Sequence, residues 1–209
     1  MSREQIRLTA EELQIPYLVH FTQATNLPSI MEHGLISVTD ANVLNINPAI
    51  NDELRLDGHR DAISLSIAFP NYRMFYRYRR DNPQVEWAVL GIEPSVIWRN
   101  DCAYCCHNAA DMRISTQQLP QLKTAESFCG MFAEIDGLEP RQTQRLNSFD
   151  PTDGQAEVLS FDVVEPQYIF AVVFNNETTK NFYQHILGSR QVLVNNSGSG
   201  YFASRSYVR

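Results

Sequence analysis

Glu157 is the side chain whose surroundings most favour catalysis. It lies near the start of residues 155–164, where β-branched and apolar side chains predict a β-strand. The preceding segment 151–154, Pro-Thr-Asp-Gly, predicts a turn. A carboxylate at the junction of a rigid strand and an open loop is well placed to act on a substrate. The alternative is that Glu157 lies on the solvated face of a half-buried strand.

A second pair of polar side chains lies near the N-terminus. His20 and Thr22 are two residues apart in the apolar run 17–22, so they share one face of the predicted strand. The next residues predict a helix with Asn26 near its start and Gly34 at its end. A helix N-terminus beside His20 would attract a phosphate or a polarised carbonyl. The alternative is a hydrogen-bonded core histidine.

A serine pair marks another strand. Residues 62–69 alternate between apolar side chains and the hydroxyls of Ser64 and Ser66, which predicts one dry face and one face able to line a cleft. The helix predicted over 72–80 carries Tyr72 and Tyr76, whose rings could stack on a flat ligand. Core packing is the simpler use of these aromatics.

The charges limit the partners. The net charge is -7, which argues against broad, nonspecific adhesion to nucleic acid. Of the 17 basic residues only two are lysines, and arginine is the side chain suited to bidentate recognition of phosphate and carboxylate. Arg55 and Arg60 lie in the long polar loop 36–61, and a loop of that length is usually functional or mobile.

The cysteines raise the question of zinc. Cys102, Cys105, Cys106 and His107 form a Cys-x-x-Cys-Cys-His run, but no second pair follows at ordinary zinc-site spacing. Reduced, buried thiols are therefore the expectation, and no metal is expected.

The remaining elements predict one α+β domain over 1–209. Helices are expected at 1–14, within 126–135 and at 178–187, and strands at 85–92, 96–98, 168–174, 191–194 and 201–204. The segment 100–150 is expected to be mostly irregular and to recognise substrate. No apolar run reaches membrane-spanning length, and the N-terminus lacks the apolar core of a signal peptide, so we expect a cytoplasmic protein with no membrane partner.

Three of these segments, in order, resemble the DarT family. These are ADP-ribosyltransferases that modify bases in DNA and act as toxins of toxin–antitoxin pairs. The N-terminal segment 20–35 is similar to the family's opening. Residues 63–76 are similar to its second strand and the aromatic helix that follows, and 156–159 to its catalytic-glutamate strand. The resemblance covers about residues 15–175.

The resemblance implies a fold and a set of roles. The fold would be an ADP-ribosyltransferase domain in which two packed, mainly antiparallel sheets flank an NAD cleft. Glu157 would be catalytic together with an arginine from the loop before the second strand, for which Arg55 is preferred over Arg60. The residues implied to bind NAD are His20, Thr22, Asn26, Ser64, Ser66, Tyr72 and Tyr76.

The resemblance also implies an activity. ADP-ribose would pass from NAD to a base of single-stranded DNA, thymine or guanine, in a toxin or anti-phage effector. The partner would be an antitoxin such as a macrodomain-type ADP-ribosyl hydrolase. The alternatives are the same chemistry on RNA or a protein, or an inactive module that binds NAD or nucleic acid.

Overall fold

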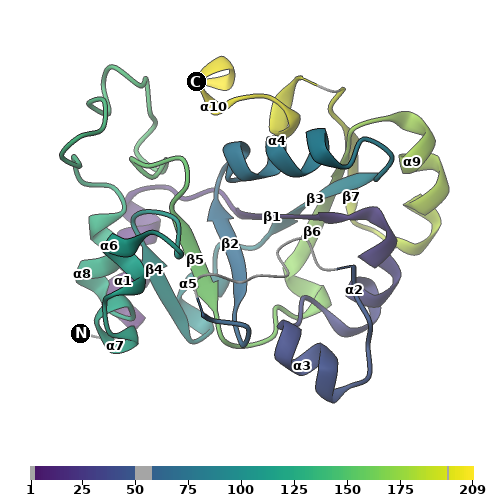
Figure 1. The fold of residues 1–209 in the computed structure, drawn as a ribbon, viewed down its shortest axis with the longest axis horizontal. Coiled ribbons are helices and arrows are strands. Elements are labelled where there is room, and N and C mark those ends of the chain that lie inside the picture. Colours follow the sequence, from purple (N-terminus) through teal and green to yellow (C-terminus); the bar gives the residue numbers. More distant parts are fainter. Residues whose placement is uncertain (1–2, 50–57, 197) are drawn as a thin grey trace.

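The computed structural model describes residues 3–49, 58–196 and 198–209. Its strands are β1 (Leu18–Gln23), β2 (Ile63–Ile67), β3 (Trp87–Ile92), β4 (Cys102–Cys105), β5 (Glu157–Ser160), β6 (Ile169–Phe174) and β7 (Gln191–Val194). They form one sheet in the order β4-β5-β2-β1-β3-β6-β7, and every neighbouring pair is antiparallel except β6 and β7 (Figure 1). The α+β class is thus confirmed. The expected pair of packed sheets is not confirmed, because the described strands pair into a single sheet.

The helices are short and irregularly spaced. The α-helices are α1 (Arg3–Glu12), α2 (Leu27–His33), α3 (Val38–Val43), α4 (Tyr72–Asp81), α5 (Val96–Arg99), α6 (Met112–Ser115), α7 (Leu119–Leu122), α8 (Ala125–Gly130), α9 (Glu177–Tyr183) and α10 (Arg205–Val208). The 3-10 turns are η1 (Ala24–Asn26), η2 (Pro166–Tyr168), η3 (Gln184–Ile186) and η4 (Gly200–Phe202). Within the described residues, every helix is too short or too polar to span a bilayer.

The sheet separates between β1 and β2. These two strands pair only at Leu18 with Ile67 and at Val19 with Ser66. Beyond those two pairs, the rest of β1 pairs with β3 alone, and the start of β2 pairs with β5 alone. We call this short ladder the seam. The two strands diverge from the seam, which leaves room between them for a cleft.

Both faces of the sheet are covered. On one face Val19 packs with Phe75 of α4 and with Trp87 of β3. On the other face Leu18 belongs to the main core, together with Leu27 of α2. The alternation of side chains along β1 therefore sends consecutive residues into two cores. Figure 1 shows α4 on one side of β1 and α2 on the other.

Three local predictions were wrong. Residues 96–98 begin the short helix α5, since Ile97 N donates to Pro94 O in a helical turn instead of extending a strand. Residues 200–202 form the turn η4 in place of the expected closing strand. The polar loop 36–61 contains α3, which Ser37 caps by accepting from Asp40 N. The segment 100–150 is mostly irregular, as expected, although it also contains the buried strand β4 and three short helices.

Candidate active site

A cleft opens where β1 and β2 separate. Side chains from both strands, from α4 and from the loop after β4 line it. Six of the residues predicted to form the site are among them: His20, Thr22, Asn26, Ser64, Ser66 and Glu157. The structure thus brings together residues that are up to 137 positions apart in the chain, 20 to 157.

Glu157 begins β5 and is 6% exposed, which excludes the solvated-face alternative. Its Oε1 accepts a hydrogen bond from Ser64 Oγ at 2.7 Å. Its Oε2 accepts from Ala109 N at 2.8 Å and from Asn108 Nδ2 at 3.1 Å. A carboxylate has only acceptors, so these three donors from two separate elements fix its orientation.

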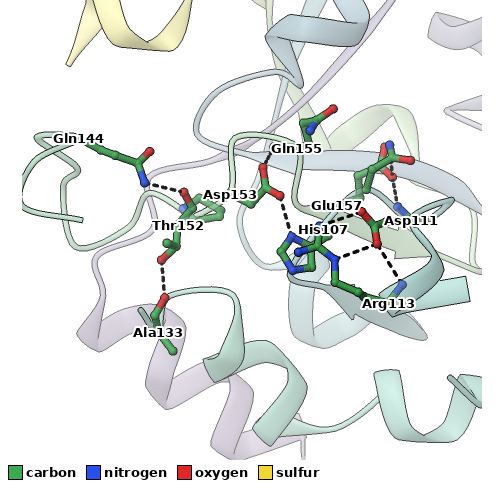
Figure 2. Close-up of polar contacts among 12 residues, drawn as sticks. His107, Asp111, Arg113, Ala133, Gln144, Thr152, Asp153, Gln155 and Glu157 are labelled. Carbon is green, nitrogen blue, oxygen red and sulfur yellow. Dashed lines mark hydrogen bonds and ion pairs between the residues drawn. The ribbon is translucent and has the colours of Figure 1, made fainter. Parts of the chain in front are cut away.

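A buried histidine lies behind the carboxylate. His107 is 4% exposed, and its Nδ1–H donates to Asp153 Oδ2 at 2.7 Å. Asp153 precedes β5, where its Oδ1 accepts from Gln155 N at 2.9 Å. Figure 2 shows His107 and Asp153 directed toward each other beside Glu157. The pair joins the loop that supplies Asn108 to the turn that leads into Glu157.

An ion pair follows His107 in the chain. Arg113 donates to both carboxylate oxygens of Asp111, at 2.9 and 2.8 Å. Hydrogen bonds from the Arg113 guanidinium and backbone hold the pKa of Asp111 well below its usual range.

The strand β1 and the turn η1 that follows it contribute His20, Thr22 and Asn26. His20 Nδ1–H donates to Ser64 O at 2.9 Å and so bridges the gap between β1 and β2. Asn26 Nδ2 donates to Thr22 Oγ1 at 2.9 Å. The same amide exchanges two hydrogen bonds with the backbone of Ala49, at 2.9 and 2.8 Å. Asn26 therefore fixes the loop over the cleft and makes no side-chain cap bond to α2.

The aromatic helix presents a different face from the one predicted. Tyr72 and Tyr76 do not line the cleft, and Tyr76 is 58% exposed. Met74 and Tyr78 line it instead, one helical turn apart on the adjacent face of α4. The alternation of β2 fixes which serines face the cleft, but an isolated aromatic run does not reveal the rotation of its helix.

The predicted arginine cannot be placed. Arg55 lies outside the described residues, so its assignment stays a prediction. Arg60 is exposed and does not line the cleft.

The cysteines are arranged as separate thiols. Cys102 and Cys105 are three residues apart on β4, so their side chains point to opposite faces and enter different cores. Burial raises the pKa of Cys102 to about 12. Across the described ranges, no three histidine, cysteine, aspartate or glutamate side chains gather as a metal site would require.

Sequence reasoning missed three groups at the site: Asn71, Asn108 and the backbone amide of Ala109. Asn71 precedes α4 and caps it by accepting from Met74 N, a role that the Pro-Asn start of the helix could have indicated. The other two lie in a loop without periodicity, and nothing in their types signals a carboxylate 48 or 49 residues away.

Solved structures share this fold. The chain matches Thermosipho africanus DarTG in complex with ADP-ribose, at 19% identity and a TM-score of 0.60, over 90% of this chain and 52% of that one. It matches Thermus sp. 2.9 DarT in complex with NAD+ at 12% identity and a TM-score of 0.53, over 87% and 96%. The same Thermus protein in complex with ADP-ribosylated ssDNA matches at 13% identity and a TM-score of 0.54, over 87% of this chain and 95% of that one. At these identities the likeness concerns the fold.

The family follows from the sequence itself. The family described as ssDNA thymidine ADP-ribosyltransferase, DarT, matches residues 19–202. The chain belongs to the DarT family, as its motifs predicted. It spans about half the length of the Thermosipho africanus chain. No curated protein matches it in sequence.

Proposed function

We propose that this protein, acting as one domain over 1–209, transfers ADP-ribose from NAD to a base of single-stranded DNA. The observation that carries the proposal is the Glu157 carboxylate, buried and held by three donors in a cleft that also contains His20 and Ser64. Family membership supports the substrate pair, and thymine is the base that the family description favours.

The chemistry needs what Glu157 offers. The C1′–N bond between ribose and nicotinamide breaks, and its electron pair leaves with nicotinamide, so positive charge develops on the ribose. A fixed carboxylate beside that carbon stabilises the charge. A ring nitrogen of the base then bonds to C1′, and its proton passes to Glu157. An unstacked base reaches such a cleft most easily in single-stranded DNA.

The proposed catalytic set is Glu157 with Arg55. In it, a guanidinium would stabilise the base as it loses its proton. The proposed NAD contacts within the cleft are His20, Thr22, Asn26, Ser64 and Ser66. Tyr72 and Tyr76 lie outside the cleft lining, so we assign to Met74 and Tyr78 the contact with the nicotinamide ring that was predicted for them.

The direct test is mass spectrometry of oligonucleotides after incubation with NAD. We expect one ADP-ribose to be added to single-stranded DNA containing thymine, and less or none to oligonucleotides in which guanine replaces thymine or to RNA. Glu157→Gln should lower the rate at least 100-fold, while the exposed Glu165→Gln should match the wild type. Release of nicotinamide without any adduct, or an active Glu157→Gln, would refute the proposal.

The partner is also proposed. An enzyme that modifies its host's DNA needs restraint, so we propose an antitoxin, either a macrodomain-type ADP-ribosyl hydrolase or a protein that covers the cleft. Expression of the wild type should arrest growth, and Glu157→Gln should not. A macrodomain-type hydrolase added to the modified oligonucleotide should remove the ADP-ribose, and a product that resists it would exclude that form of antitoxin.

A further inference from the structure

Asn71 carries an unused hydrogen-bond donor at the wall of the cleft. The residue is 1% exposed and lines the cleft. Its Oδ1 accepts from Met74 N at 3.2 Å and caps α4. Its Nδ2 is buried, and no described residue offers it an acceptor. A buried polar group left without a partner costs roughly 1–3 kcal/mol, so this one calls for an explanation.

The position of Asn71 distinguishes it from the other unpaired groups. The described residues include two more buried nitrogens without a partner, Arg79 Nε and Trp87 Nε1. Neither of these residues lines the cleft, and both pack against Phe75 in the core beneath α4. Of these three nitrogens in the described residues, the amide of Asn71 therefore alone combines burial, a missing partner and a place in the cleft wall.

Two hydrogen bonds relate the position of Asn71 to that of the carboxylate through β2. Asn71 N donates to Ser66 Oγ at 3.3 Å, so the residue lies over Ser66. Ser66 follows Ser64, the donor to Glu157, on the same face of β2. Two residues along a strand span about 6.6 Å. A flat ring with a polar substituent could therefore extend from the carbon beside Glu157 to the amide of Asn71.

The walls around that path suit a flat cationic ring. Phe21, Met74 and Tyr78 line the same cleft as Asn71, and Met74 N bonds directly to Asn71. Aromatic faces attract a pyridinium ring electrostatically, and a thioether packs well against it. The carboxamide on the nicotinamide ring of NAD is such a substituent, and its oxygen is an acceptor.

We propose that Asn71 Nδ2 donates a hydrogen bond to the carboxamide oxygen of the nicotinamide ring. The inference rests on the proposed function, since it identifies which half of NAD this wall recognises. The cap bond to Met74 N already holds the side chain in place, so binding does not have to order it. Asn71 then orients the leaving group while Glu157 stays beside the ribose.

The test compares two ligands on two variants. Asn71→Asp keeps the capping oxygen but loses the donor, and Asn71→Ser keeps a good cap without adding charge. Carba-NAD, which is not cleaved, and ADP-ribose, which lacks nicotinamide, are titrated calorimetrically into each variant and the wild type. Melting curves check the fold. We expect the Kd for carba-NAD to rise about tenfold or more, and the Kd for ADP-ribose to stay within about twofold.

The outcomes separate cleanly. An equal loss of affinity for carba-NAD and for ADP-ribose would place Asn71 at the ADP-ribose half or in a purely structural role. Unchanged affinity for both ligands would remove Asn71 from the NAD site. Either result overturns the inference. Wild-type protein that binds neither ligand would refute the proposed function as well. A test without any variant uses wild-type competition: free nicotinamide should displace carba-NAD at concentrations where pyridine does not.

Discussion

At the residue scale, the hydroxyl of Ser64 makes the shortest of the three hydrogen bonds to Glu157 described above. It donates at 2.7 Å from the strand next to β5. Ser64→Ala removes one hydrogen bond to a charged group, a loss of about 1.5–3 kcal/mol if the bond serves the transition state fully. We expect kcat to fall about tenfold or more, measured as nicotinamide release in single turnover. The exposed Ser206→Ala is the control, and unchanged kinetics of Ser64→Ala would show that the carboxylate does not need this donor.

The sequence identified the residues of the site that lie on regular strands. The alternation in β2 placed Ser64 and Ser66 on one face, and the turn before β5 placed Glu157 at a strand start. Asn108 and Ala109 could not be found, because a loop that crosses to a distant carboxylate has no local period. The positions of Tyr72 and Tyr76 outside the cleft lining could not be predicted for a similar reason. The rotation of α4 about its axis is set by the packing of Phe75 in the core, and the local sequence holds no information on that packing.

At the element scale, the His107–Asp153 pair connects the two loops that hold Glu157. His107→Ala leaves the carboxylate of Asp153 without its buried donor, so we expect a loss of about 1–3 kcal/mol in the free energy of unfolding and a several-fold lower kcat. His107→Asn should recover most of both, since its Nδ2 takes the place of the imidazole Nδ1. Urea denaturation and single-turnover kinetics measure the two effects.

The exposed His33→Ala is the matched control for that pair. If His107→Ala and His107→Asn were equally impaired, the side-chain shape of histidine and not its hydrogen bond would be what matters.

Gly34 ends α2 and packs closely against the segment that follows β5. Its φ is +82°, and an added Cβ would lie 2.4 Å from Val164 O, where Leu35 and Val164 form an isolated bridge. Gly34→Ala combines a backbone region costing about 1–3 kcal/mol with a steric clash, so we expect at least that loss of stability. Thermal and urea denaturation measure it against Gly130→Ala, whose new methyl group meets nothing. Equal stability of both variants would contradict the close approach.

The elements themselves were predicted unevenly. Strands with clean alternation or continuous apolar runs, such as β2 and β6, were found, because their period is local. The strand β4 was not, since the segment 100–150 shows no clear period and the burial of β4 depends on the distant β5. The 201–204 segment was read as a strand from its apolar residues, whereas Phe202 enters the core from a 3-10 turn.

At the scale of the whole molecule, arginines fix the segment ahead of Glu157 to the C-terminal residues. Arg205 Nη1 donates to Pro151 O at 2.7 Å. Arg209 donates to both carboxylate oxygens of Asp150, at 2.7 and 2.8 Å. Arg141 Nη1, from within the loop, donates to Asp150 O at 2.7 Å. The Arg141 guanidinium thus faces the protein, so within the segment 100–150, which was expected to recognise substrate, this side chain serves the fold instead.

Arg209→Ala would leave the Asp150 carboxylate, 0% exposed, with the two donors of Asn147 as its remaining partners among the described residues. Removing one partner of a buried ion pair costs on the order of 3–5 kcal/mol, and we expect a loss near the lower end. Chemical denaturation measures it, and Asp150→Asn in the same background should restore part of the loss because the buried charge is then gone. A variant within about 0.5 kcal/mol of the wild type would mean that the pair is dispensable.

The seam between β1 and β2 has a consequence for how this fold can vary. The ladder between the two half-sheets has only two residue pairs among the described strands, and the bonds from His20 to Ser64 O and from Ala68 N to Tyr17 O add to it, so the opening angle of the cleft depends on few hydrogen bonds. Leu18 and Ile67 lie at the seam and do not line the cleft. Changes in their size would alter the width available to a substrate without touching a single residue that contacts it. Substitutions in the interior of the protein can therefore change its substrate preference while the residues that line the cleft stay the same.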